Sequence, residues 1–298
     1  MKLFFIDIFI KMENNITKRY IQLLQKQAKL AISYYDNNNI TKCFTLANNL
    51  YNNNEIKYLK NKLRYRLMFV LGNILYNNTH NKSIINKYKS FRILSYIIDN
   101  DGLKYLYDKI KYIVMLLLGF MYYNGIVTKK NYEKSFILLS DVYKTDIFKF
   151  FTVADCCVLQ KVLGDIYYHN KCYTEAFSHY MFIYKHQDKL KNVNIIQRVI
   201  CALANMYHNG IGTKQDDVKA FNLSNESINN CSTLHNTNKC KITYTLGICY
   251  YNGIGTTQNY KKATEYFTKF INFVNDNNNN KLKSNYIVAK RILKNIQK

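Results

Sequence analysis

The sequence contains no proline and no tryptophan among its 298 residues, and only 19 acidic residues. Arginine is also rare, with 6 copies against 37 of lysine, whereas asparagine occurs 40 times and tyrosine 28 times. Proline, tryptophan and most arginine codons are rich in G and C, while asparagine, lysine, tyrosine and isoleucine codons are rich in A and T. The composition therefore favours an extremely A/T-rich genome, such as that of a large DNA virus or a protist.

The scarcity of acidic residues leaves a net charge of +24. Such a charge usually points to nucleic acid or another polyanion. Here codon bias also supplies lysine, and the lysines are dispersed along the chain. Basic clusters at 57–66 and 283–298 are typical of polar helix faces, and a genuine polyanion-binding face is the alternative.

Sequence motifs of common enzyme classes are missing. The chain has no G-x-x-x-x-G-K-[ST] loop, no H-E-x-x-H and no G-x-S-x-G, the motifs of phosphate binding, zinc proteases and serine hydrolases. The eight cysteines form no C-x-x-C pair of the zinc-binding kind, and the six histidines are scattered. We therefore expect no enzyme, no catalytic residue, no cofactor and no metal.

Long apolar runs are missing too. The longest, at 113–123, is far shorter than the roughly 20 residues of a membrane span. Residues 3–10 are apolar but interrupted by Asp7, and no small-residue cleavage site follows, so we expect a helical turn or an extension ahead of an alternative start at Met12 rather than a signal peptide. With cysteines in positions typical of buried, reduced thiols, this predicts an intracellular, cytoplasmic protein without membrane contact.

A repeat organises most of the chain. Six small residues, here called anchors, are spaced 40–47 residues apart, and five of them are followed three positions later by tyrosine. The anchors are Ala31, Gly72, Gly119, Gly164, Ala204 and Gly247. A second small residue follows each anchor after 12, 16 or 18 residues, at Cys43, Ser90, Ser135, Ala176, Ala220 and Ala263. Small residues let two helices approach closely where they cross, so the spacing predicts six antiparallel helix pairs.

Three copies also share finer details. Leu-Gly or Leu-Ala, then Tyr and Asn-Gly, recur at 118–125, 203–210 and 246–253, and Lys-Ser or Lys-Ala recurs at 134–135, 219–220 and 262–263. This pattern resembles the Sel-one-like repeat, and the copies with short turns resemble the related tetratricopeptide repeat. The resemblance extends, more loosely, over 158–187, 27–50 and 66–98. It implies a right-handed superhelix of helix pairs that serves as a protein–protein adaptor.

We therefore expect one all-α domain, a right-handed α-solenoid of about six antiparallel helix-pair repeats plus a C-terminal capping helix at 281–298. An N-terminal extension at 1–16 precedes repeats at 17–54, 57–99, 104–145, 153–187, 194–230 and 238–274. First helices are expected near 17–36, 57–78, 104–124, 153–169, 194–209 and 238–252. Second helices are expected near 40–53, 85–99, 131–145, 173–187, 216–230 and 259–274.

The anchors also predict which residues face a ligand. In tetratricopeptide-type arrays the first helices line the concave surface, with positions −6, −3, +1 and +4 from the anchor exposed. Position +4 holds Tyr35, Tyr76, Tyr123, Tyr168, His208 and Tyr251. Positions −6 and +1 add Arg66, Asn73, Arg198, Asn205 and Lys241. A row of tyrosines suits a peptide because tyrosine offers area and a hydrogen-bonding tip; the alternative is a second structural aromatic in each repeat.

Two functions follow from these residues. The favoured one is a non-catalytic scaffold or adaptor that binds a peptide or protein partner on the concave face, where amides and basic side chains hold an extended backbone and carboxylates. The alternative is a basic α-solenoid that binds single-stranded nucleic acid or another polyanion through interleaved aromatic and basic residues. Steep salt dependence would distinguish the second from the first.

Overall fold

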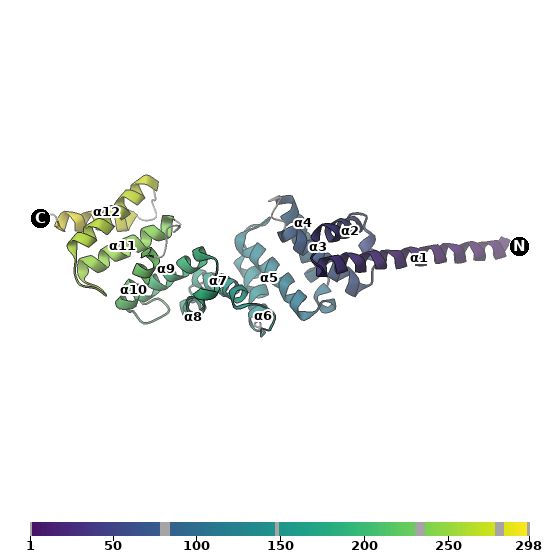
Figure 1. Ribbon diagram of the computed structural model, residues 1–298, viewed down its shortest axis with the longest axis horizontal. Helices are drawn as coiled ribbons and strands as arrows, with labels where there is room; N and C mark the ends of the chain where they lie inside the picture. Colours follow the sequence, from purple (N-terminus) through teal and green to yellow (C-terminus); the bar gives the residue numbers. More distant parts are fainter. Residues whose placement is uncertain (1, 78–83, 147–148, 230–235, 278–282, 297–298) are drawn as a thin grey trace. The chain divides into compact units, whose positions relative to one another are not determined.

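The computed structural model describes residues 2–77, 84–146, 149–229, 236–277 and 283–296. The described residues form α-helices joined by turns, and no β-strand occurs among them. The chain divides into two compact units, Met1–Thr145 and Asp146–Lys298. Each unit is a stack of antiparallel helix hairpins, as expected of an α-solenoid (Figure 1). The all-α prediction is confirmed.

The first unit contains three hairpins. Its helices are α1 (Lys2–Asp36), α2 (Ile40–Asn52), α3 (Asn61–Asn77), α4 (Ile84–Asp99), α5 (Asp108–Asn124) and α6 (Tyr132–Tyr143). Each first helix packs on its own second helix, and α1 also packs along α3. The expected extension at 1–16 is continuous with the first helix, because α1 begins at Lys2 and its N-terminal half runs beyond α2 and α3 (Figure 1).

The second unit contains three hairpins and one further helix. Its helices are α7 (Val153–His169), α8 (Tyr173–Lys185), α9 (Val193–Asn209), α10 (Asp217–Asn229), α11 (Asn236–Asn252), α12 (Tyr260–Asn277) and α13 (Lys283–Ile296). The last helix packs on α12 and buries Ala289 and Ile292. A helix is thus present where one was expected, within 281–298, whose outermost residues lie outside the described part of the chain. That it caps the array stays a prediction.

One backbone hydrogen bond closes five of the hairpins, both those with short turns and those with turns four residues longer. The residue that precedes the second helix donates its backbone N–H to the carbonyl of the residue at anchor +3, which is tyrosine in each of these hairpins. The pairs are Asn39–Tyr34, Asn131–Tyr122, Cys172–Tyr167, Asp216–Tyr207 and Asn259–Tyr250, at 2.7–3.0 Å. In four of the five, the side chain of the same residue also accepts a hydrogen bond from the N–H three positions later, which caps the second helix.

The small residues lie where the two helices of a hairpin cross. All six anchors are buried. A Cβ atom added to Gly119 would come within 2.5 Å of Leu139 Cδ2, and one added to Gly164 within 2.8 Å of Tyr180 Cε1. The second small residue contributes as well, because the Ser135 hydroxyl donates to the Gly119 carbonyl oxygen at 2.8 Å. Close helix crossing is thus the physical reason for the small residues.

Aromatic side chains join successive hairpins. The phenylalanine after the second small residue meets the tyrosine at +3 of the next repeat edge to face, with centroids 5.3–5.5 Å apart, in the pairs Phe91–Tyr122, Phe177–Tyr207 and Phe221–Tyr250. The lysine before the second small residue lies over the tyrosine at +3 of its own repeat, as Lys134 does over Tyr122 and Lys262 over Tyr250. The Lys-Ala step therefore combines a cation–π contact with a helix crossing.

Two first helices begin later than the sequence indicates. α3 and α5 begin four residues after the expected 57 and 104. Single turns of 3-10 helix precede them, η1 (Glu55–Tyr58) and η2 (Gly102–Tyr105). Each turn follows a residue with positive φ, Asn54 at 58° and Asp101 at 54°. Asparagine and aspartate adopt this conformation more readily than most residues, so the chain turns here without a glycine.

Candidate functional site

The predicted ligand-facing residues fall into a group in each unit. Tyr35 lies on α1, Arg66, Asn73 and Tyr76 on α3, and Tyr123 on α5; Tyr168 lies on α7, Arg198, Asn205 and His208 on α9, and Tyr251 on α11. Lys241 also belongs to α11, but its side chain lies outside the described part of the chain. The tyrosines at +4 are half-buried, whereas Arg198 and Asn205 are exposed.

A tyrosine and an asparagine link neighbouring first helices in both units. Asn73 Nδ2 donates to the Tyr35 hydroxyl at 2.5 Å, from position +1 of one repeat to position +4 of the preceding repeat. Asn205 forms the same side-chain hydrogen bond with Tyr168. Burial raises the pKa of both tyrosines, and the asparagine partially offsets that rise. The same two positions are therefore connected in each unit, and the asparagines also set the spacing between repeats.

Three of the tyrosine rings at +4 pack against the beginning of their own second helix. Tyr123 meets Tyr132, Tyr168 meets Tyr173 and Tyr251 meets Tyr260, with ring centroids 5.2–5.8 Å apart. In the fifth repeat the same contact is polar, because His208 Nδ1 lies 2.8 Å from Asp217 Oδ1. Much of the surface of these three tyrosine rings therefore contacts their own hairpins. Such packing is what the alternative interpretation, a second structural aromatic in each repeat, would require.

The two arginines of this set differ in their surroundings. Arg66 on α3 forms an ion pair with Asp36 at the end of α1, at 2.8 Å. Arg198 on α9 has no acidic residue of the described chain within ion-pair distance. An exposed guanidinium without an acidic partner can bind a carboxylate through two parallel hydrogen bonds. Arg198 is therefore the stronger candidate for contact with a ligand.

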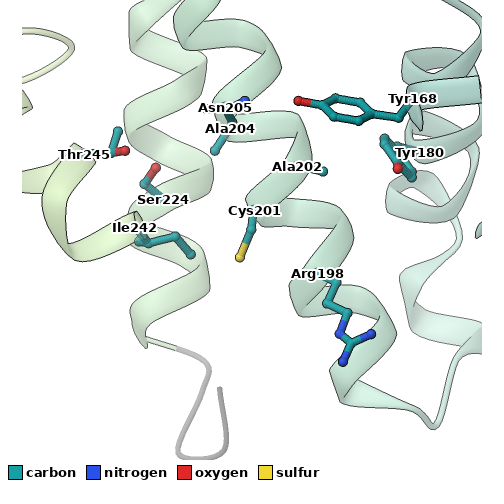
Figure 2. A pocket seen from close by; sticks show the side chains of 10 residues that line it. All are labelled: Tyr168, Tyr180, Arg198, Cys201, Ala202, Ala204, Asn205, Ser224, Ile242 and Thr245. Atoms are coloured by element: carbon teal, nitrogen blue, oxygen red, sulfur yellow. The ribbon is translucent and has the colours of Figure 1, made fainter. Parts of the chain in front are cut away.

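A cavity of about 190 Å³ brings Tyr168, Arg198 and Asn205 together in the second unit. Its remaining walls are Tyr180, Cys201, Ala202, Ala204, Ser224, Ile242 and Thr245. Figure 2 shows Tyr168 and Tyr180 on one side of α9, and Ser224, Ile242 and Thr245 on the other. The α9 residues Cys201, Ala202 and Ala204 have small side chains, which leave space beside the helix for the cavity.

One polar atom of this cavity lacks a partner. The Ser224 side chain is fully buried, and its hydroxyl forms no hydrogen bond within the described residues. An unsatisfied buried hydroxyl is costly, so this atom favours a ligand with a polar group. Sequence reasoning missed Ser224, because its position on the second helix α10 gives no sign that it reaches the face lined by the first helices.

Burial disfavours the charged forms of three cysteines and one histidine. Burial raises the pKa of the Cys43, Cys157 and Cys249 thiols to about 11. Burial likewise lowers the pKa of His179 to about 4, and its Nδ1 pairs with the Gln160 side chain. Thiols of this kind are poor nucleophiles at neutral pH. The surroundings of these side chains are those of packing residues.

No group of three or more metal-ligating side chains occurs among the described residues. Among the helices of the described chain, none combines the length and apolar character that crossing a membrane requires. The groups that the cavity offers to a polar ligand are the Asn205 amide, the hydroxyls of Tyr168 and Ser224, and the Arg198 guanidinium.

Two solved structures are similar to this chain. A Sel1 repeat protein from Oxalobacter formigenes is 15% identical with a TM-score of 0.46, and the match covers 85% of this chain. The protein c5321, a protective antigen of uropathogenic Escherichia coli strains with an SLR fold, is 15% identical with a TM-score of 0.43 over 91% of this chain. The matches span 66% and 62% of those two proteins.

Comparison with curated proteins finds no significant match. The family description of the Sel1 repeat matches residues 114–140, 199–229 and 244–272. Each range contains one of the three copies, at 118–125, 203–210 and 246–253, that share the finer details of the repeat. The third, fifth and sixth helix pairs therefore match the Sel1 repeat.

Proposed function

We propose that this chain is a non-catalytic scaffold that binds an extended peptide segment of a protein partner on the face lined by its first helices. The observation that carries the proposal is the cavity around Arg198, Asn205 and Tyr168, with the unpartnered Ser224 hydroxyl at its wall. Sel1 repeats generally serve in protein-interaction scaffolds, which supports the same function.

The size of the cavity favours a peptide over a small molecule. Pockets that enclose drug-sized ligands usually measure about 300–1,000 Å³, whereas this one measures about 190 Å³. It accommodates one side chain or one terminal group. Arg198 supplies a charge for a carboxylate, and Asn205 supplies an amide for a peptide backbone.

The packing of the +4 tyrosines makes single-stranded nucleic acid the weaker alternative. Proteins that bind single strands stack the bases on exposed aromatic faces. Here Tyr123, Tyr168 and Tyr251 are half-buried against tyrosines of their own hairpins. Rings packed in this way offer little face for the stacking of bases, which favours a peptide as the ligand.

A peptide-display selection on the full chain tests the proposal. Enriched peptides should bind the wild-type chain and lose about tenfold or more in affinity to the double variant Arg198→Ala, Asn205→Ala, since each side chain contributes a charge-assisted or amide hydrogen bond. The matched control is Lys191→Ala, Asn194→Ala, two exposed residues near the start of α9 that do not line the cavity. Equal affinity for both variants, or no enrichment at all, would contradict the proposal.

The salt dependence of binding separates the two partner classes. A peptide complex should weaken only slightly between low and physiological salt, whereas a nucleic-acid complex loses affinity steeply and log-linearly. A steep slope for a single-stranded oligonucleotide, together with tighter binding than any selected peptide, would favour the alternative.

We also infer that the protein acts inside a cell. The thiols of Cys43, Cys156, Cys157 and Cys249 are free and buried, as expected where the cytosol keeps thiols reduced. Thiol labelling of the denatured protein, isolated from its host under non-reducing conditions, should find these four cysteines reduced.

A further inference from the structure

The first unit contains a second hollow on the same kind of surface. A groove of about 610 Å³ lies between α1 and α3 and includes the residues that lead into α3. The two helices pack side by side (Figure 1). The groove is lined by one face of α1, from Gln25 to Asp36, and by residues 60–66.

The groove is strongly basic. Four cationic side chains line it, Lys29, Lys60, Lys62 and Arg66, against a single acidic one, Asp36. Arg66 is already paired with Asp36 at 2.8 Å. The three lysines are exposed, and none of them forms an ion pair with the described residues. Lys62 lies over the ring of Tyr107, which orients its side chain but leaves its charge uncompensated.

The beginning of α3 adds to this positive potential. The helix starts at Asn61, between Lys60 and Lys62, and its first turn contains no acidic residue. The first backbone N–H groups of a helix carry a partial positive charge and lack partners within the helix. An anionic group at this end of the groove would therefore meet both lysine side chains and the helix start.

Apolar side chains line the groove as well. Ile32 on α1 and Leu63 on α3 contribute to its lining. Among the described residues, no aromatic side chain lines it, so they offer no face on which a nucleic-acid base could stack. A ligand that alternates carboxylates with apolar side chains matches both features, and a single strand of nucleic acid matches only the charge.

The net charge of the chain argues against a second copy as the occupant of this groove. The chain has 43 basic and 19 acidic residues, so two copies repel each other electrostatically. The occupant must be acidic, and the groove is open enough for a segment of chain. We propose that the groove between α1 and α3 binds an acidic segment of a partner protein, in which Asp or Glu residues alternate with apolar residues.

This inference rests on the proposed scaffold function and gives it a ligand class in the first unit. The probe is a short fluorescent peptide in which Asp and Glu alternate with Leu, measured by anisotropy with the full chain at physiological salt. The double variant Lys29→Glu, Lys62→Glu should bind the probe at least about tenfold more weakly, since it reverses two of the lining charges. The neutral variant Lys29→Gln, Lys62→Gln should fall between the two.

The matched control is Lys89→Glu, Lys129→Glu, which changes the net charge equally at two exposed lysines of the same unit, outside the groove. It should retain the affinity of the wild-type chain within about twofold, because surface charges beyond the roughly 8 Å Debye length are screened. An equal loss of affinity for the probe in the control and groove variants would show that net charge alone drives the binding, and it would overturn the inference. A single-stranded oligonucleotide that competes fully with the peptide and shows a larger groove-variant effect would overturn it too.

The outcomes also separate this inference from the proposed function. If display-selected peptides bind and respond to Arg198→Ala, Asn205→Ala, while the acidic probe does not bind or ignores Lys29→Glu, Lys62→Glu, only the groove inference fails. If neither selected peptides nor the acidic probe bind, the scaffold function fails and the groove inference fails with it. Circular dichroism of each variant verifies that its helices remain intact.

Discussion

Gly210 and Gly212 lie two residues apart in one turn, and the turn needs them for different reasons. Both have positive φ, 64° and 69°. A Cβ atom on Gly210 would meet nothing closer than 3.4 Å, whereas one on Gly212 would collide with the Tyr173 carbonyl group at the start of α8. Gly210 is therefore required only for its backbone conformation, and Gly212 also for the close approach of its loop to the preceding repeat.

Alanine at each glycine should separate the two requirements. Gly210→Ala should lower the free energy of unfolding by about 1 kcal/mol, the cost of a left-handed residue with a Cβ atom. Gly212→Ala should lower it by at least about 2 kcal/mol, because the loop must also move away from α8. Urea denaturation of both variants measures the difference, and equal losses would mean that the loop yields without cost.

His179 provides a pH dependence that belongs to one residue. It is 7% exposed, and its folded-state pKa of about 4 lies below the ordinary value of 6.5. The unfolded chain therefore binds a proton as the pH falls through 6.5, while the folded chain resists it down to about 4. The free energy of unfolding should fall over this window by about 3 kcal/mol from this residue.

The variant His179→Asn tests this assignment. Removal of the imidazole removes the titration, so the free energy of unfolding of the variant should change less between pH 6.5 and 4 than that of the wild-type chain. Denaturation curves at several pH values measure both slopes. Parallel curves for the two proteins would assign the acid sensitivity to other groups.

At the scale of the helix pair, the crossing point controls stability. Gly119→Ala places a methyl group against Leu139 and should cost about 1–3 kcal/mol. Leu139→Ala should cost about 2–5 kcal/mol through the cavity that it leaves. Because the methyl group enters that cavity, the double variant should cost less than the sum by about 1 kcal/mol or more.

Chemical denaturation of the three variants completes this double-mutant cycle. Ala204→Gly is the matched control, because its anchor already carries a Cβ atom; it should lose only about 1 kcal/mol of helix propensity. Strict additivity of Gly119→Ala and Leu139→Ala would show that the two side chains do not compete for the crossing.

The beginnings and ends of most helices could be predicted from the sequence because a local chemical signal marks them. The anchors, the Asn-Gly steps and the capping residues Asn39, Asn131 and Asn259 recur at fixed offsets. The 3-10 turns after Asn54 and Asp101 lack such a signal, since neither site carries glycine. From the sequence, the residues of these turns were therefore predicted to begin the next α-helix. In the structure they form separate 3-10 turns.

The proposed binding face was harder to predict than the helices. Sequence spacing places Tyr168, Arg198 and Asn205 on first helices, but the cavity between them depends on the separation of neighbouring repeats. The hydrogen bonds from Asn73 to Tyr35 and between Asn205 and Tyr168 also join different repeats. The periodicity of residues within one helix does not determine the separation between neighbouring repeats.

At the scale of the whole chain, the repeats need a cover at their end. In the second unit α13 packs on α12, close to the cluster of Phe267, Phe270 and Val274. A repeat stack whose last apolar face is uncovered loses stability in that repeat first. That the two units continue one array stays a prediction.

Removal of residues 283–298 tests the role of the cover. Hydrogen exchange should accelerate in α11 and α12 by a factor of about ten or more, because local opening there becomes easier. The helices of the first unit should keep the protection that they have in the full chain, and they serve as the internal control. Unchanged hydrogen exchange in α12 would show that α13 does not stabilise that helix.

The hydrogen bond that closes five of the hairpins has a practical consequence. Asn39 and Tyr34 are bonded across a short turn, whereas Asn131 and Tyr122 form the same bond across a turn four residues longer. The intervening residues are therefore free to vary in number, and evolution can lengthen or shorten a turn without shifting the register of either helix. Ile126 and Val127 of the longer turn pack on the core, whereas Lys129 and Lys130 are exposed. A foreign epitope or reporter peptide inserted between Lys129 and Lys130 should therefore be displayed while the repeats beneath it keep their packing.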